Sequence, residues 1–499
     1  MKSMATIGLA IGLTASVASA QTLRIGLAED PDVLDPTLAR TFVGRVVFAS
    51  LCDKLVDITP ELTVVPQLAT DWKFSDDQKS LTLKLRAGVV FHDGEAFDAE
   101  AAKFSLDRHL SMPGSFRRGE ISAIEKVVVV DPMTVRIDLK APFAPLIAQL
   151  TDRAGMMVSP KAAKALGDKF GTAPVCAGPY RFVERIAQDR IVVERFDRYW
   201  QKEKVSIQRI EYRPIIDSTV RLANLKSGGL DFIERVAATD LGEVRKDSRL
   251  KLSSIVELGY QGITINVGSG ERAKSAIGAN PKVREALELS IDRNALNQVV
   301  FNGEFKPGNQ WVSPDNAAYV KEKPIPARDV AKAKRLLAEA GHPNPIVHFM
   351  VPTTGEQQQV AQVVQAMAKE SGFDIRIQAT EFASSLNIAE KGDFEMYLLA
   401  WSGRTDPDGN LFNFVACNGP NNYSKFCNKD VEALLDKSRL TNDLAQRRAA
   451  WGEIAKITLD QRPIVYIYHR KWFWAHTSKL SGLVEYPDGL VRVVGLKMN

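Results

Sequence analysis

Residues 66–95 read PQLATDWKFSDDQKSLTLKLRAGVVFHDGE and carry the most specific pattern in the chain. Residues 81–85 alternate apolar and polar side chains, which is the period of a half-buried β-strand. Asp93 and Gly94 then form a turn signal. His92 beside Asp93 has the residue types of a base and its orienting group, but we favour a packed or exposed histidine next to a turn.

Two motifs in this region resemble the signature of one family of transport proteins. They are Pro-x-Leu-Ala-x-x-Trp at 66–72 and Leu-Arg-x-Gly-Val-x-Phe-His-Asp-Gly at 85–94. The family is that of the extracellular solute-binding proteins of family 5, which serve peptide- and nickel-type ABC importers. Further segments similar to the family follow in the family's order and extend the resemblance over almost all of the chain after residue 20. They are residues 177–182, 220–231, 283–287 and 291–293.

The resemblance implies a two-lobe α/β periplasmic-binding-protein fold (type II, cluster C) with an extra inserted α/β subdomain. Lobe I would combine residues 21–56, 172–264 and 476–499. The inserted subdomain would span 57–171, and the ligand-clasping lobe II would span 265–475.

The same resemblance implies a carrier and not an enzyme. Such a protein closes around a solute in the cleft between its lobes and delivers it to an ABC permease and ATPase complex at the inner membrane. We expect a monomer that needs no cofactor and binds no nucleic acid.

The first 20 residues have the features of a secretory signal peptide. Lys2 precedes an apolar run at 7–17, and Ala18-Ser19-Ala20 is a small-residue cleavage site. A buried first helix or strand is the alternative. The first cysteine is Cys52, so no cysteine is placed for an N-terminal lipid anchor. We therefore expect a periplasmic protein cleaved after Ala20.

Composition and patterning agree with a large α/β protein. The chain has 499 residues, 45% of them apolar, and this length predicts more than one domain. The net charge of +5 is scattered, which argues against a nucleic-acid groove. Strand and helix patterns alternate along the chain. The expected strands are 22–27, 81–85, 127–131, 134–139, 191–196 and 207–212. One expected helix begins at residue 99, after Asp98, and three others span 217–225, 282–302 and 327–340.

Four cysteines fit an exported protein with two disulfides. Counting alone allows three pairings. Cys417 and Cys427 bracket a Gly-Pro-Asn-Asn turn and form the easy local pair, which leaves Cys52 with Cys176. Free thiols and a zinc site are the alternatives, although no Cys-x-x-Cys spacing supports zinc.

The loop at 401–410 is the main candidate for contact with a ligand. It follows an apolar strand at 396–400, and polar loops at such strand ends bind ligands in open α/β sheets. In peptide-binding relatives this segment supplies an acid for the peptide ammonium, and Asp406 is the matching residue. Arg404 stands where relatives often carry another acid, and its guanidinium suits a carboxylate or phosphate. Arg404 and Asp406 would otherwise pair with each other as scaffolding, and Trp401 would stack on ligand or fill core.

Three further residues are weaker candidates for the ligand site. Tyr260, with Gln261, precedes a strand near the expected hinge and would touch ligand or order the crossing strands. Trp311 lies in a loop that lines the cleft in relatives. Glu29 follows the first strand and would face the cleft, with a solvated turn as the alternative.

Other site types find little support. Asp406, Asp408 and Asn410 imitate a calcium loop, but Cys417 stands at the twelfth position, where a glutamate is needed. The six histidines have no metal-ligand spacing, so we expect no metal site. A Gly-x-Gly-x-x-Ala run at 268–273 lacks the second strand with an acidic end that a dinucleotide site requires. A secreted hydrolase with a spatially assembled triad remains a distant alternative.

The ligand prediction rests on the Arg404 and Asp406 loop. We expect a short peptide or an amino-acid-derived compound with a carboxylate. A non-peptide anionic metabolite, such as an opine or a sugar conjugate, is the alternative.

Overall fold

The computed structural model describes residues 21–499. The expected signal peptide, residues 1–20, lies outside the described residues. Across residues 21–499, no helix combines the length and the apolar character that crossing a membrane requires.

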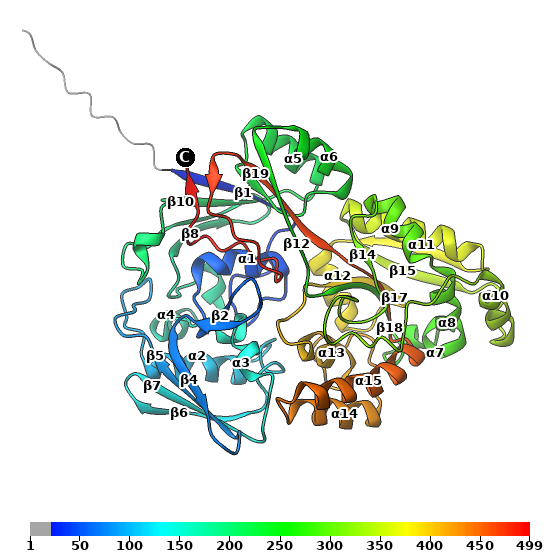
Figure 1. Cartoon of the computed structure of the whole chain (residues 1–499), viewed down its shortest axis with the longest axis horizontal. Helices are drawn as coiled ribbons and strands as arrows, with labels where there is room; N and C mark the ends of the chain where they lie inside the picture. Colours follow the sequence, from blue (N-terminus) through cyan, green and yellow to red (C-terminus); the bar gives the residue numbers. More distant parts are fainter. Residues whose placement is uncertain (1–20) are drawn as a thin grey trace, which may run out of the picture.

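A seven-stranded sheet occupies the upper left of Figure 1. Its central strand runs parallel to both neighbours, and the other pairs are antiparallel. In spatial order the strands are β12 (Leu250–Val256), β19 (Lys471–Thr477), β11 (Phe232–Ile233), β1 (Thr22–Leu27), β10 (Arg209–Pro214), β9 (Arg190–Arg195) and β8 (Tyr180–Ile186).

A four-stranded antiparallel sheet lies below it in Figure 1 and has its own apolar core. The strands are β4 (Ala69–Phe74), β5 (Ser80–Leu85), β7 (Thr134–Leu139) and β6 (Ile124–Asp131), in that order. We call the parts built on these two sheets the first half of the molecule.

A six-stranded sheet organises the second half, on the right of Figure 1. Its strands are β14 (Lys306–Pro307), β18 (Ile464–His469), β13 (Tyr260–Ile265), β17 (Met396–Trp401), β15 (Ile346–Pro352) and β16 (Asp374–Thr380), in that order. Two short ribbons complete the strands: β2 (Val56–Ile58) with β3 (Val64–Pro66), and β20 (Leu480–Ser481) with β21 (Lys497–Met498).

The helices divide between the halves in chain order. The first half contains α1 (Phe42–Leu51), α2 (Ala99–Ser111), α3 (Leu146–Gln149), α4 (Pro160–Leu166), α5 (Ser218–Ser227) and α6 (Leu241–Lys246). The second half contains α7 (Ala276–Ala279), α8 (Pro281–Ser290), α9 (Arg293–Phe301), α10 (Val330–Glu339), α11 (Gly355–Lys369), α12 (Phe382–Glu390), α13 (Asp408–Val415), α14 (Lys429–Arg439) and α15 (Leu444–Gln461).

The chain passes between the two large sheets through two short connections. Residues 257–259 join β12 to β13, and Arg470 alone joins β18 to β19. β12 and β19 pair with each other and run side by side toward the second half in Figure 1. The expected lobe boundaries near 264 and 475 fall a few residues beyond these connections, and the domain limits stay a prediction.

The start of α2 and both ends of α5 lie at residues whose side chain or backbone conformation caps a helix. The side chain of Asp98 accepts from the backbone of Ala101 at the start of α2, as expected. Asp217 caps α5 in the same way, and Gly228 ends it with φ +79°, a conformation that glycine adopts without a steric penalty.

The single helix expected at 282–302 is wrong. The structure has α8 and α9 instead, with a break at Ile291 and Asp292. The Asp292 carboxylate accepts from the backbone N–H of Ala295 and so begins a new helix.

Both preferred disulfides are present. Cys52 pairs with Cys176 across 124 residues of chain, and Cys417 pairs with Cys427 across ten. The first bridge follows α1 and precedes β8, so it ties together the two chain segments that flank the four-stranded sheet.

His92 has a structural place beside this bridge. One ring nitrogen lies 3.1 Å from the carbonyl oxygen of Gly178, and burial lowers the pKa of the imidazole to about 4. Asp93 accepts from the hydroxyl of Ser159 at 2.6 Å, and Gly94 turns the chain with φ +89°. The motif at 91–94 therefore packs against the disulfide region.

Candidate functional site: a cavity between the two halves

A cavity of about 350 Å³ lies between the two halves. The first half contributes the loop after β1, the segment after β11 and the start of α5. The second half contributes β13, the start of α11 and the end of β17. The connections at 257–259 and Arg470 border the cavity as well. A molecule held here would touch both halves.

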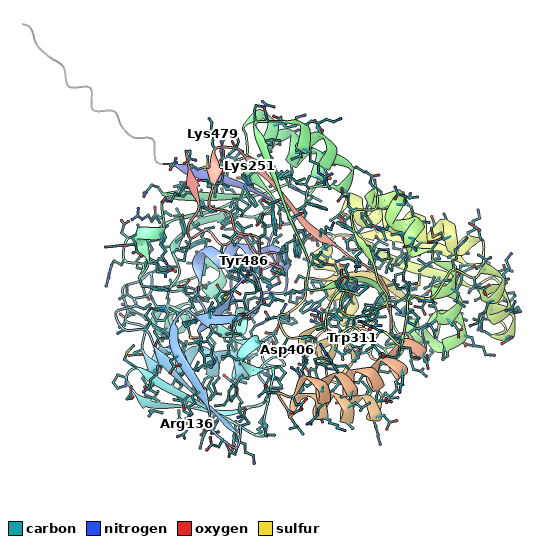
Figure 2. All side chains as sticks on the ribbon, in the orientation of Figure 1. Arg136, Lys251, Trp311, Asp406, Lys479 and Tyr486 are labelled. Carbon is teal, nitrogen blue, oxygen red and sulfur yellow. A yellow bond between two sulfur atoms is a disulfide. The ribbon has the colours of Figure 1, made fainter. Side chains whose placement is uncertain are left out.

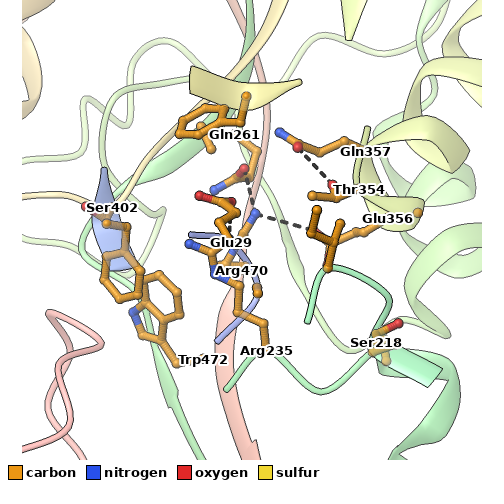
Figure 3. A pocket seen from close by; sticks show the side chains of 18 of the residues that line it. Glu29, Ser218, Arg235, Gln261, Thr354, Glu356, Gln357, Ser402, Arg470 and Trp472 are labelled. Carbon is orange, nitrogen blue, oxygen red and sulfur yellow. Dashed lines mark hydrogen bonds and ion pairs between the residues drawn. The ribbon is translucent and has the colours of Figure 1, made fainter. Parts of the chain in front are cut away.

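Glu29 and Arg235 form a charged pair on the side of the first half (Figure 3). Arg235 Nη1 donates to Glu29 Oε1 at 2.7 Å. The Oε2 atom of Glu29 and the Nε atom of Arg235 are buried without a hydrogen-bond partner. The pair therefore keeps one acceptor and one donor unused.

Arg235 occupies an uncommon backbone conformation. Its φ is +50°, a left-handed conformation that costs free energy for any residue other than glycine. The carbonyl oxygen of Arg235 accepts from Arg221 Nη2 at 3.1 Å, which helps to hold this turn. The guanidinium lies 5.1 Å from the ring centre of Phe42, so an aromatic face supports it from the other side.

Arg470 is the centre of a second charged group. Figure 3 shows Arg470 between Gln261 and Glu356, and its Nη2 donates to them at 2.9 and 3.3 Å. Its backbone N–H donates to Glu257 Oε1 at 2.9 Å. Burial disfavours the charge of Arg470, but Glu356 and Glu257 outweigh burial and raise its pKa. Burial also raises the pKa of Glu257 to about 7, although Arg470 opposes it.

Aromatic rings complete the cavity wall. Trp472 stacks on Phe42 with ring centres 4.5 Å apart. The indole N–H of Trp401 donates to Asn410 Oδ1 at 2.9 Å, which fixes the plane of the ring at the cavity edge. The wall thus offers apolar faces beside the two charged groups, as ligand sites usually do.

A smaller pocket of about 60 Å³ adjoins the cavity. Both spaces share part of their lining, including Arg40, Arg153 and Trp401. Arg404 lines the smaller pocket, and its guanidinium lies 4.4 Å from the ring centre of Trp401. We call this space the side pocket.

The structure separates the predicted site residues. Glu29 and Trp401 line the cavity, and Arg404 lines the side pocket. Asp406 lines neither space; both its oxygens accept from Arg447, at 2.7 and 2.8 Å. Arg404 and Asp406 therefore have separate partners and do not pair with each other.

Tyr260 and Trp311 lie in the apolar core of the second half. Tyr260 packs edge-on against Phe414 and Tyr466, with ring centres 5.5 and 4.7 Å away. Trp311 is fully buried, and in Figure 2 it lies in the second half, to the right of Asp406. Neither residue lines the cavity.

Sequence reasoning missed Arg235, Arg470, Glu257 and Glu356. They lie in four different segments and meet only through the fold. One signal was available, because Arg235 lies two residues after β11 and Arg470 falls between two apolar strands. Charged residues at strand ends are candidates for a ligand site in α/β sheets.

Comparison with known families identifies the chain. The profile of the bacterial extracellular solute-binding proteins, family 5 Middle, matches residues 63–422. This chain belongs to that family. The resemblance of the motifs at 66–94 is confirmed, and the family-5 protein has the expected two-lobe α/β fold.

Curated relatives match the family-5 protein over nearly its whole length. The glutathione-binding protein GsiB of Salmonella paratyphi A is 31% identical over 501 residues, which cover 98% of this chain and 96% of the relative. GsiB of Escherichia coli O1:K1 is 30% identical over 499 residues, covering 97% and 96%.

Solved structures share the fold. The periplasmic binding protein AgaA of A. tumefacien R10, in complex with agropinic acid, is 28% identical with a TM-score of 0.87, covering 96% of this chain and 99% of AgaA. DppA of Helicobacter pylori, in complex with the peptide STSA, has a TM-score of 0.88 at 23% identity, covering 96% and 98%. The second likeness concerns the fold alone.

Proposed function

We propose that this family-5 protein captures a short peptide or an amino-acid-derived compound with a carboxylate and passes it to an ABC permease and ATPase complex. The observation that carries the proposal is the cavity wall, which pairs guanidinium and carboxylate groups at two places. Arg235 with Glu29 is one, and Arg470 with Glu356 is the other. A zwitterionic solute needs both an anion partner and a cation partner, and charge-assisted hydrogen bonds are the strong ones.

The size of the cavity favours a short ligand. Its volume of about 350 Å³ lies toward the lower end of the roughly 300–1,000 Å³ of ligand pockets. The glutathione-binding relatives support the same class, because glutathione is a short peptide with carboxylates. They favour the peptide hypothesis over the opine or sugar-conjugate alternative.

Binding would be coupled to closure of the two halves. Glu29 and Arg235 belong to the first half, whereas Gln261 and Glu356 belong to the second. A solute contacts both sets only when the halves are together, so it stabilises the closed state over the open one. The permease would then recognise the closed protein.

We propose binding without turnover. Ser218 and Ser402 line the cavity, but within residues 21–499 no histidine lines it beside them. The carboxylates of the wall, Glu29, Glu257 and Glu356, each accept a hydrogen bond from an arginine instead. The periplasm is the proposed location and a monomer the proposed state.

Native mass spectrometry of protein freshly purified from periplasm tests the function. A ladder of released masses at amino-acid spacings, or one mass of a short peptide or amino-acid derivative, supports the proposal. A single non-peptide mass that lacks a carboxylate overturns the ligand class. Continuous loss of a bound peptide with the appearance of its fragments would overturn binding without turnover.

A further inference from the structure

The side pocket is surrounded by more buried positive charge than negative charge. Four arginines that are each at most 5% exposed gather around it and its junction with the cavity, and the carboxylates among them are those of Glu120 and Asp152. The arginines are Arg45, Arg117, Arg153 and Arg404. Arg40 also lines the pocket but has its own partner, Glu390, at 3.3 Å.

The two carboxylates are shared among the four guanidinium groups. Glu120 Oε1 lies 2.7 Å from Arg117 and 3.2 Å from Arg404. Asp152 lies 2.5 Å from Arg45, 3.4 Å from Arg153 and 3.6 Å from Arg404. Four positive and two negative charges leave a surplus of two positive charges.

Asp488, a further acid near the cluster, does not remove this surplus. Asp488 acts on Arg45 and Arg404 from a greater distance, but it is already paired with Arg492 at 2.9 Å. A guanidinium keeps its proton in proteins, so the cluster cannot neutralise itself. Buried charge without a partner is costly, which makes a bound anion the natural complement.

Arg153 has the least compensation in the cluster. Its Nη1 donates to the carbonyl oxygen of Ala39 at 2.7 Å, and its distance of 3.4 Å to the carboxylate of Asp152 is longer than the shortest carboxylate distance of each of the other three arginines. Burial, followed by the neighbouring Arg117, disfavours its positive charge and lowers its pKa despite Asp152, so this charge is poorly stabilised while the guanidinium keeps its proton. Arg153 lines both the cavity and the side pocket, so an anion that reaches in from the cavity passes its guanidinium.

We infer that the side pocket binds an oxyanion group of the captured solute, with Arg153 as its main partner. The inference rests on the proposed function and adds a second recognition point to it. The body of the solute would lie in the cavity, and one carboxylate or phosphate would enter the side pocket. Beside this group, the unpartnered Oε2 of Glu120 would accept from a donor on the same solute.

The size and walls of the pocket fit one small group. A volume of about 60 Å³ has room for a few water molecules or one small polar group. Phe116, Phe382 and Phe414 close the space with apolar surface. Ion pairing with such buried guanidinium groups is stronger than in open water, because the effective dielectric constant is lower there.

Anion-dependent melting of the whole mature protein tests the inference. Succinate and inorganic phosphate are compared with chloride at equal ionic strength, for the wild type, Arg153→Gln and Arg136→Gln. Arg136 lies on β7 with its side chain 42% exposed, so its substitution removes the same charge far from the pocket. We expect wild type and Arg136→Gln to melt about 2 °C or more higher in at least one oxyanion.

Arg153→Gln is expected to lose this response. Its melting temperature in chloride should equal or exceed that of the wild type, because one of the repelling charges is gone. A purely structural arginine would instead lower melting in every salt. Should Arg153→Gln not fold, Arg153→Lys replaces it, with an expected loss of apparent affinity of about tenfold as the planar fork is lost.

The two oxyanions distinguish the chemical source. A response to succinate assigns a carboxylate, and a response to phosphate alone assigns a phosphate ester. Equal responses of wild type and Arg153→Gln, or no wild-type response to either oxyanion, overturn the inference. Native mass spectrometry identifies the solute in either case, so the proposed function is tested independently of the side pocket.

Discussion

Arg404 donates to Glu120 across the border between the two halves, with Nη2 and Oε1 3.2 Å apart. Arg404 follows β17 of the second half, and Glu120 lies between α2 and β6 of the first. The residue expected from the sequence to meet a solute carboxylate thus meets a carboxylate of the protein. The pair belongs to the contacts that hold the halves together, together with the bond from Arg45 to Ser402 at 3.0 Å.

Glu120→Gln should destabilise the folded protein strongly. The substitution removes one of the two carboxylates that compensate four buried arginines, and breaking such a buried pair costs about 3–5 kcal/mol. Urea unfolding followed by circular dichroism measures the loss. Glu194→Gln is the control, because its partner Arg181 is exposed and the pair contributes at most about 1 kcal/mol. Equal effects of the two substitutions would contradict the cluster as described.

Arg235→Gln should weaken binding of the solute that copurifies with the protein. A charged hydrogen bond contributes about 1.5–3 kcal/mol, so the dissociation constant should rise about 10- to 100-fold. Isothermal titration calorimetry measures the change. Arg213→Gln, on β10 of the same sheet and paired with Glu211, provides a control that should bind normally. An affinity of Arg235→Gln within twofold of the wild type would remove this residue from the site.

Glu257 should make stability depend on pH near neutrality. Burial raises its pKa in the folded protein to about 7, above the ordinary value of 4.5. The folded state therefore binds more protons than the unfolded state between these values, and stability falls as pH rises from about 4.5 to 7.

Comparison of wild type with Glu257→Gln isolates this contribution. The free energy of unfolding of the wild type should fall by about 2–3 kcal/mol relative to the variant between pH 5 and pH 8. Glu61→Gln, an exposed substitution on the connection between β2 and β3, should follow the wild type. Parallel pH profiles of wild type and Glu257→Gln would show that Glu257 is ionised at pH 5.

The two disulfides should differ in their contribution to stability. In the chain-entropy model a bridge across 124 residues is worth about 5 kcal/mol and one across ten about 3 kcal/mol. Replacing Cys52 and Cys176 by serine should therefore cost more than replacing Cys417 and Cys427. Urea unfolding of both double variants gives the comparison, and the reverse order would be inconsistent with stabilisation through the unfolded chain.

The elements that the sequence predicts well are those with local causes. Asp217 and Gly228 mark both ends of α5, and the alternation at 81–85 marks β5. The break between α8 and α9 was missed because the apolar pattern continues through Ile291, while the capping bond of Asp292 interrupts the helix. The preferred cysteine pairs agree with the structure. Cys417 and Cys427 are close in sequence, and once they are paired only Cys52 and Cys176 remain.

The site was less predictable because its partners are distant in sequence. Asp406 was the acid expected from the resemblance to contact a ligand, yet both its oxygens accept hydrogen bonds from Arg447 on α15. Arg404 likewise meets Glu120, which lies 284 residues away. Glu29, expected from the sequence to face the cleft, lines the cavity because it follows the carboxyl end of β1, a general position for ligand contact in parallel sheets, and its contact with a ligand stays a prediction.

Arg470 is both the single residue between β18 and β19 and a part of the cavity wall. If the proposed function holds, the side chain that contacts the solute belongs to the same connection that bends when the solute enters or leaves. A substitution of Arg470 would therefore change both the preference for a solute and the rate at which the solute is released. Engineering of a new ligand preference should start from Glu29, Arg235 and the side pocket. Substitutions there change the contacts with the ligand but leave the connections between the two halves unchanged.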